Sequence, residues 1–93
     1  MTNKPRVVVC AANRHTPTGY IVCSARHYDD NMLRQMHMSE TPWEDVNDVE
    51  QGFIDQFGTF MTRKQALRVA TEAGQIKYRC GGDHKELFSE NLY

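Results

Sequence analysis

The sequence lacks the features that would place it directly in a membrane, secreted or nucleic-acid-polymer class. No run approaches the roughly 20 apolar residues that a membrane-spanning helix needs. Lys plus Arg total 11 and Asp plus Glu total 12, and the resulting net charge of −1 argues against a protein that binds a nucleic-acid polymer. The segment before Arg6 has no apolar core of a secretory signal, so a cytoplasmic protein without a membrane partner is expected.

Cysteine is scarce, and the common cofactor motifs are missing. The three cysteines, Cys10, Cys23 and Cys80, form no CxxC pair, which favours reduced thiols. Cys10 and Cys23 lie in apolar runs and are expected in the core. Cys80 and His84 have no second pair of ligands beside them, and a structural zinc site needs four. Without GxxxxGK[ST] or GxGxxG either, the sequence predicts no metal and no cofactor.

The chain is short, with 93 residues and 40% apolar composition. This length allows one domain, residues 1–93, and buries only a modest fraction of the surface. The chain also has four Tyr, four Phe and five Met. We therefore expect a homo-oligomer, in which part of the apolar surface lies between subunits.

The first half of the chain is predicted to form a β-hairpin and a helix. Two apolar, β-branched runs flank a segment with the turn-forming Pro17 and Gly19. An acidic N-cap and an apolar stripe then predict a short helix that Pro42 should end. The predicted elements are a strand at 6–12, a loop at 13–19, a strand at 20–25 and a helix at about 31–37, capped by Asp29 or Asp30.

The second half is predicted to repeat this order, which makes the fold α+β, with two β-hairpins and two short helices in a single small domain. Gly58 should take a positive φ in the second turn, Thr62 and Gln65 match a capping box, and Gly74 should end the helix. The C-terminal residues are apolar enough to dock on the core or a neighbour. The expected elements are strands at 49–55 and 59–61, a helix from Thr62 to Gly74, an extended segment at 76–79, a loop at 80–84 and a docked segment at 87–93.

Six acidic residues lie between 40 and 55, and no Lys or Arg lies between Arg34 and Arg63. A charge run of this kind is usually a solvated face. It could instead contact a basic partner, with Trp43 as an anchor, and the protein would then be an inhibitor that binds a host enzyme.

The basic residues indicate an anion site more directly. Arg63 and Lys64 open the second helix, where positive side chains oppose the helix dipole unless an anion lies nearby. Arg63 could alternatively pair with an acid of the 40–55 segment. Arg, an aromatic ring and an amide side chain together suit a nucleotide. The expected ligand-binding residues are Arg26 and Arg63 on phosphate, Lys64 as a longer-range charge, His27 as a hydrogen-bond donor, Tyr28 on a base or ribose, and Gln51 or Gln75 on a base edge.

No catalytic residue is assigned. Nucleotide hydrolysis needs a positioned base and usually a metal, for which Glu50 and Asp55 are the only suggestion. A small nucleotide hydrolase therefore stays open as an alternative to a protein that only binds its ligand.

Five segments carry a resemblance that covers nearly the whole chain: ARHYD at 25–29, EQGFID at 50–55, GTFMTRKQA at 58–66, AGQI at 73–76 and LFSENLY at 87–93. The sequence resembles a widespread family of small phage-encoded proteins. It is also similar to the anti-CBASS sponges, which sequester cyclic dinucleotide alarm signals made by bacterial immune enzymes. This resemblance implies a non-enzymatic oligomer in the cytoplasm of the infected host that binds signals such as cyclic GMP–AMP.

Overall fold

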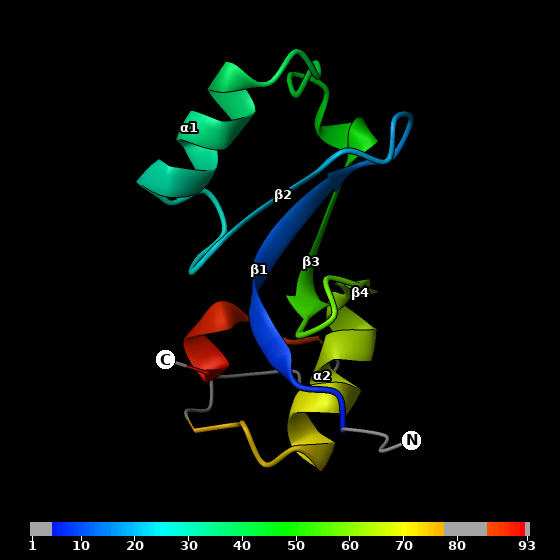
Figure 1. The fold of residues 1–93 in the computed structure, drawn as a ribbon, viewed down its shortest axis with the longest axis vertical. Helices are drawn as coiled ribbons and strands as arrows, with labels where there is room; N and C mark the ends of the chain where they lie inside the picture. The colour runs from blue at the N-terminus through cyan, green and yellow to red at the C-terminus, as the bar shows by residue number, and fades with distance from the viewer. Residues whose placement is uncertain (1–4, 78–85, 93) are drawn as a thin grey trace.

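The two predicted hairpins are joined into one four-stranded antiparallel sheet of order β2-β1-β3-β4 (Figure 1). The computed structural model describes residues 5–77 and 86–92. The predicted α+β class is confirmed. The elements are β1 (Val8–His15), β2 (Ile21–Ser24), α1 (Asp30–Met38), η1 (Val46–Asp48), β3 (Val49–Asp55), β4 (Phe60–Thr62), α2 (Arg63–Glu72) and η2 (Ser89–Asn91), where η is a 3-10 helix.

Strand β1 extends further than the sequence predicts. The sequence predicts a loop at Asn13, Arg14 and His15. In the structure Asn13 and Arg14 pair with both β2 and β3, and His15 pairs with β3. Asn13 and His15 are 0% and 2% exposed, so two polar side chains point into the protein from this stretch. The prediction was wrong because β3 supplies backbone partners as far as Val49, and this long-range pairing overrides a local turn preference.

The helix ends follow the predicted caps. The Asp29 carboxylate accepts a hydrogen bond from the Met32 N–H at 2.9 Å, which satisfies a free amide of the first turn of α1. Thr62 and Gln65 form the expected capping box of α2, and Gly58 and Gly74 have φ values of +80° and +69°. Helix α1 ends at Met38, four residues before Pro42.

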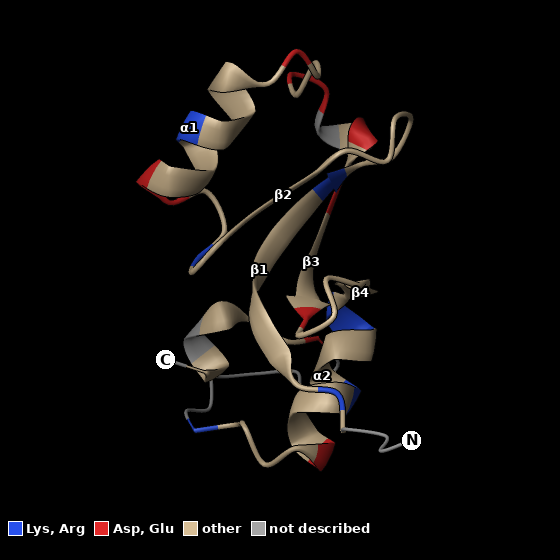
Figure 2. Cartoon of the chain, viewed as in Figure 1, with Lys and Arg blue, Asp and Glu red and all other residues tan. Residues whose placement is uncertain are grey.

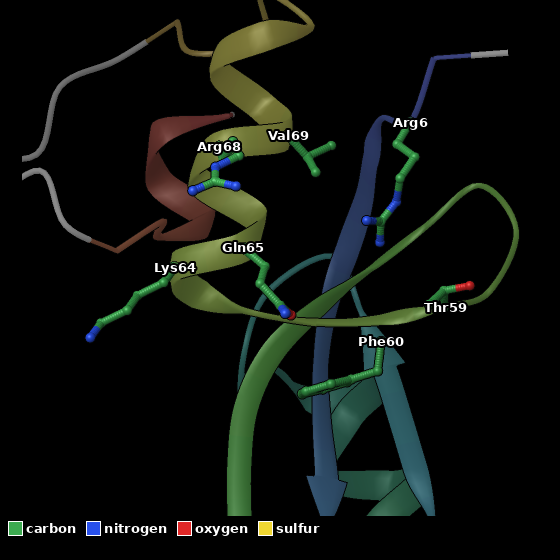
Figure 3. A pocket seen from close by; sticks show the side chains of 7 residues that line it. All are labelled: Arg6, Thr59, Phe60, Lys64, Gln65, Arg68 and Val69. Carbon is green, nitrogen blue, oxygen red and sulfur yellow. The ribbon is translucent and has the colours of Figure 1, made fainter. Parts of the chain in front are cut away.

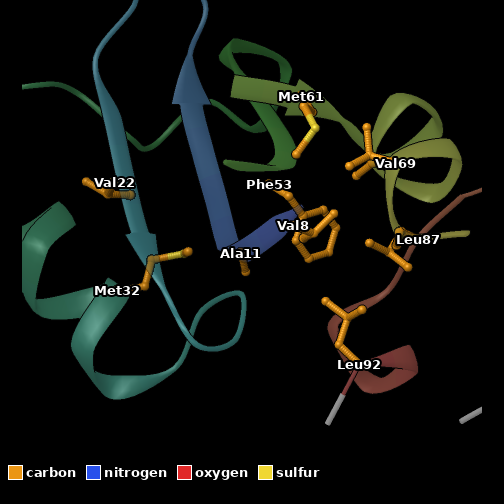
Figure 4. Close-up of a cluster of buried hydrophobic side chains, with 11 residues drawn as sticks. Val8, Ala11, Val22, Met32, Phe53, Met61, Val69, Leu87 and Leu92 are labelled. Atoms are coloured by element: carbon orange, nitrogen blue, oxygen red, sulfur yellow. The ribbon is translucent and has the colours of Figure 1, made fainter. Parts of the chain in front are cut away.

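The hydrophobic core lies between the sheet and the two helices (Figure 4). Val22 and Met32 lie at the α1 side, whereas Phe53, Met61 and Val69 lie at the α2 side, with the small Ala11 between them. Both helices contribute to this one cluster, so they cover the same face of the sheet. Phe53 is 0% exposed, while Phe60 is only half-buried.

The C-terminal segment docks on the core, as predicted. Leu87 and Leu92 are buried in the cluster, and the Leu87 N–H donates to the Arg63 carbonyl at 3.1 Å. Lys77 is joined to the same segment through the Asn91 carbonyl, at 2.9 Å. The rest of the predicted 76–79 segment and the predicted 80–84 loop, with Cys80 and His84, lie outside the described residues.

Cys10 and Cys23 are half-buried and lie on the sheet face opposite the helices, rather than in the core. This follows from the alternation of side chains, because Cys23 pairs with Ala12 and not with Ala11. Burial, together with the neighbouring Cys23, raises the pKa of the Cys10 thiol to about 12. Cys10 therefore stays protonated at neutral pH and is a poor nucleophile.

Candidate anion-binding site

Three of the sequence-predicted site residues meet on β3. The Arg63 Nη2 donates to Gln51 Oε1 at 2.6 Å, and His27 Nε2 lies 2.8 Å from the carbonyl oxygen of the next residue, Gly52. The His27 ring also meets the edge of the Phe53 ring at 5.2 Å between centroids. The loop after β2 and the start of α2, which are 36 residues apart at His27 and Arg63, thus contact the same stretch of one strand.

Arg63 is not paired with an acid from the 40–55 segment. Among the described residues it contacts the neutral Gln51 amide and the Phe88 ring, whose centroid is 4.9 Å from the guanidinium carbon. Its Nε is buried and has no hydrogen-bond partner within residues 5–77 and 86–92. A half-buried guanidinium with one N–H unused keeps capacity for a further acceptor.

Arg26 and Tyr28 belong to the turn that leads into α1. The backbone N–H of Arg26 donates to the Asp29 carboxylate at 3.3 Å. Tyr28 adopts a positive φ of 58° and is 42% exposed. The Tyr28 ring therefore lies at the surface. Among the described residues, no contact with another aromatic ring fixes its orientation.

Gln75 lies apart from the other predicted site residues. Its Oε1 accepts from the Val8 N–H at 2.8 Å, and its Nε2 donates to the Val8 carbonyl at 2.9 Å. Gln35 binds the N–H and carbonyl of Cys23 in the same way. The side-chain amides of Gln75 and Gln35 thus bond backbone groups that a neighbouring strand would otherwise bond. These contacts explain the position of Gln75 without a ligand.

Gln75→Ala is expected to lower the free energy of unfolding by about 1–3 kcal/mol, because it leaves the two backbone groups of Val8 without partners. Urea denaturation measures the change. Gln56→Ala is the matched control, since Gln56 makes the same kind of paired contact with Val7 and Pro5 at an exposed site. Equal stability of Gln75→Ala and wild type would contradict the structural role.

Lys64 points to a different side of α2 from its neighbour Arg63, because consecutive helical residues are about 100° apart. It lines an open pocket of about 440 Å³ beside the helix, which we call the α2 pocket (Figure 3). In Figure 3, Arg6 and Gln65 extend toward the same space and Lys64 reaches outward from its rim. The lining residues are Arg6, Thr59, Phe60, Lys64, Gln65, Arg68 and Val69.

The α2 pocket has a cationic lining with no carboxylate in it. Lys64 and Arg68 are four residues apart on α2, a spacing at which like charges repel. Neither makes an ion pair within the described part of the chain. An adjoining pocket of about 280 Å³ shares Arg6, Arg68 and Val69 and continues along the helix. Bound anions would relieve the repulsion between these side chains.

Asp55 fixes the third cation of the pocket. The Arg6 Nε donates to Asp55 Oδ2 at 2.9 Å, and Asp55 is 3% exposed. Burial alone would raise the pKa of this carboxyl, but hydrogen bonds from the Thr59 and Phe57 N–H groups and from Arg6 outweigh burial, so its pKa lies below the ordinary 3.8. This bond uses one of the five N–H donors of the Arg6 guanidinium, so the bond itself does not exhaust its capacity to donate to a ligand.

The lowered pKa of Asp55 predicts a loss of stability in acid. A group with a depressed folded-state pKa stabilises the fold above its unfolded pKa, near 3.8, and loses that contribution as pH falls through the lower folded value. The free energy of unfolding should therefore fall as the pH is lowered below about 5. Asp55→Asn should be less stable than wild type at pH 7 and show a shallower decline, in urea denaturation at several pH values. An unchanged slope would contradict this role.

The first part of the acidic segment, residues 40–48, lies at the opposite end of the molecule from α2 (Figure 2), whereas Asp55 at the end of β3 pairs with Arg6 at the α2 pocket. Trp43, its candidate anchor, is half-buried, and its indole N–H donates to Ser39 Oγ at 2.8 Å. The ring meets His15 and Tyr20 edge-on at 5.7 and 6.3 Å. Trp43 is thus used within the fold, and it does not stand out as an anchor for a partner protein.

Two absences hold for residues 5–77 and 86–92, the part of the chain that the structure describes. Within these ranges, no three His, Cys, Asp or Glu side chains gather closely enough to hold a metal ion. No helix there has the length and apolar character required to cross a membrane. Lys64 is the one lining residue of the α2 pocket that the sequence predicted as a site residue. The cations Arg6 and Arg68 were missed, although the spacing of Lys64 and Arg68 on one helical face was a readable signal.

The chain matches the sequence model of a known protein family. The sequence model of a family described as "Phage T4 y16D protein" matches residues 7–93. No curated protein matches the chain. No solved structure matches it either.

Proposed function

The chain belongs to the phage T4 y16D protein family, and we propose that it sequesters a phosphate-bearing nucleotide, of the cyclic dinucleotide class, without hydrolysing it. The observation that carries this proposal is the α2 pocket. Cations from two separate segments, Arg6 before β1 and Lys64 and Arg68 on α2, line one open space without a carboxylate among its lining residues.

The charge of the pocket suits such a ligand. Asp55 offsets the charge of Arg6, so within the α2 pocket Lys64 and Arg68 leave two positive charges for a ligand. The adjoining pocket adds one carboxylate, Glu72, so the phosphates are expected in the α2 pocket itself. A cyclic dinucleotide carries two phosphodiester groups, each with one negative charge. Charge-assisted hydrogen bonds from Lys and Arg to phosphate are among the stronger polar contacts in proteins.

The size and the other lining groups also favour a nucleotide over a simple ion. About 440 Å³ lies within the usual range for small-molecule sites, and the adjoining pocket extends the same groove. Phe60 offers an apolar ring, while Thr59 and Gln65 offer a hydroxyl and an amide for ribose or base. The Gln65 Oε1 accepts from the Thr62 N–H, so its NH₂ group is the end that faces a ligand.

Titration calorimetry with cyclic GMP–AMP tests the proposal. We expect saturable binding that weakens as ionic strength rises, because two partly exposed cations supply the attraction. Absence of heat at low salt, with the same result for other cyclic dinucleotides, would overturn it and favour the alternative of a protein partner. Self-association stays a prediction from chain length, and sedimentation of the same samples measures it.

A further inference from the structure

The adjoining pocket continues the α2 pocket along the helix but differs from it in charge. Its volume is about 280 Å³, and it shares Arg6, Arg68 and Val69 with the α2 pocket. Its other lining residues are Pro5, Glu72 and Ala73, so Glu72 is the one carboxylate among the described residues that line it. Because the two pockets share a wall, a ligand bound in the α2 pocket can extend into the adjoining pocket.

Glu72 is a charged residue that no contact within the described fold accounts for. It is the last residue of α2, where a negative charge opposes the helix dipole. Its side chain is exposed, and within residues 5–77 and 86–92 it makes no ion pair, although Arg68 lies one turn away. The Glu72 carboxylate is therefore available to a ligand in the adjoining pocket.

Given the nucleotide binding proposed above, we propose that the adjoining pocket holds a base of the nucleotide and that Glu72 selects guanine. The Watson–Crick edge of guanine presents two adjacent donors, the N1–H and the N2 amino group. An ionised carboxylate accepts at both oxygens, so Glu72 can bind both donors at once. Adenine presents an acceptor, N1, beside its N6 amino donor, and its N1 lone pair would face a carboxylate oxygen. The adjoining pocket therefore favours guanine over adenine.

The spacing along α2 fits a nucleotide that is held by both its phosphate and its base. Lys64, Arg68 and Glu72 follow one another at intervals of four residues. Arg68 and Glu72 are thus about 6 Å apart along the helix axis, and Lys64 and Glu72 about 12 Å. A phosphate bound between Lys64 and Arg68 leaves the base one turn further along, beside Glu72. Pro5 and Ala73 line the same space and offer apolar surface to the base.

Calorimetric titration with cyclic di-GMP and cyclic di-AMP, which share their phosphates and differ only in their bases, tests the role of Glu72. Wild-type protein should bind cyclic di-GMP about tenfold or more tightly than cyclic di-AMP, as one bidentate base contact allows. Glu72→Gln should weaken cyclic di-GMP binding about tenfold or more, because the Gln amide offers only one acceptor to an edge that needs two. The same variant should bind cyclic di-AMP at least as tightly as wild type does, since an amide matches N1 and N6 of adenine.

A general charge effect predicts the opposite sign. Loss of a carboxylate strengthens the attraction for any anion, so charge alone would make Glu72→Gln bind cyclic di-GMP more tightly. Glu40→Gln is the matched control, because Glu40 is an exposed acid that lines neither pocket. It should bind both nucleotides within about twofold of wild type, since distant exposed charges are largely screened.

Three results would overturn the role of Glu72. They are equal affinities of the wild-type protein for the two nucleotides, unchanged or tighter cyclic di-GMP binding by Glu72→Gln, and an equal loss in Glu40→Gln. Each of them leaves the proposed function in place, because the protein still binds a cyclic dinucleotide. Absence of binding by both nucleotides and by cyclic GMP–AMP would instead overturn the proposed function, and the role of Glu72 with it.

Discussion

Arg68→Glu is expected to weaken the binding of cyclic GMP–AMP by about 100-fold or more, because it removes a charge-assisted contact and places a carboxylate beside the phosphate. Arg68 lines both the α2 pocket and the adjoining pocket, so its replacement affects the whole groove. The side chain is exposed, and its reversal relieves the repulsion from Lys64 while adding a similar small repulsion from Glu72, four residues further along α2. The fold should therefore persist, and calorimetry measures the loss of affinity.

Arg34→Glu is the matched control for this prediction. Arg34 is an exposed arginine on α1, outside the α2 pocket, and its reversal changes the net charge by the same amount. Binding by Arg34→Glu should stay within about twofold of wild type, since distant exposed charges are largely screened. Similar losses in the two variants would show a general charge effect and remove the α2 pocket as the site.

Gly52→Ala should destabilise the protein more than any other single change considered, by about 3 kcal/mol. A Cβ at Gly52 would lie 2.1 Å from the Met61 carbonyl oxygen and 2.6 Å from Phe60 Cζ. The Phe60 ring can turn aside, but the carbonyl belongs to the β3–β4 pairing and can move only if the strands separate. The melting temperature should fall by roughly 12–24 °C, as measured by circular dichroism.

Gly19→Ala separates this steric effect from ordinary glycine strain. Gly19 has a φ of +76° but open space around its Cα, so an added Cβ meets nothing within 4 Å. Its replacement should cost about 1 kcal/mol, from the positive φ alone. Comparable melting temperatures for the two variants would mean that Met61 is not the constraint on Gly52.

Local signals were sufficient to predict most of the fold. The capping box at Thr62 and Gln65, the acidic cap at Asp29 and the positive φ of Gly58 each depend on residues close in sequence, and each was confirmed. The extension of β1 from Asn13 to His15 was not predicted. It depends on pairing with β3, some 36 residues away, and no turn propensity contains that information.

The candidate site was harder to predict for the same reason. The sequence places Arg63 and Lys64 together at the start of a helix, yet consecutive helical residues are about 100° apart, so Arg63 contacts Gln51 whereas Lys64 lines the α2 pocket. Arg6 precedes β1, and its guanidinium is held beside the α2 pocket by a hydrogen bond to Asp55 at the end of β3. This contact joins residues far apart in the sequence. Gln75 was expected on a ligand. In the part of the chain that the structure describes, however, β2 pairs with β1 only from Ala11 onward, and the Gln75 amide bonds the free backbone groups of Val8 instead.

Capture and release of cyclic GMP–AMP tests the central claim most directly. Excess protein is incubated with the nucleotide and removed by filtration, and the retained protein is then denatured by heat. Mass spectrometry measures the nucleotide in the filtrate and in the heated sample. Sequestration predicts depletion from the filtrate and full recovery of the intact cyclic form after heating. Linear or mononucleotide products, or a filtrate that keeps its nucleotide, would contradict it.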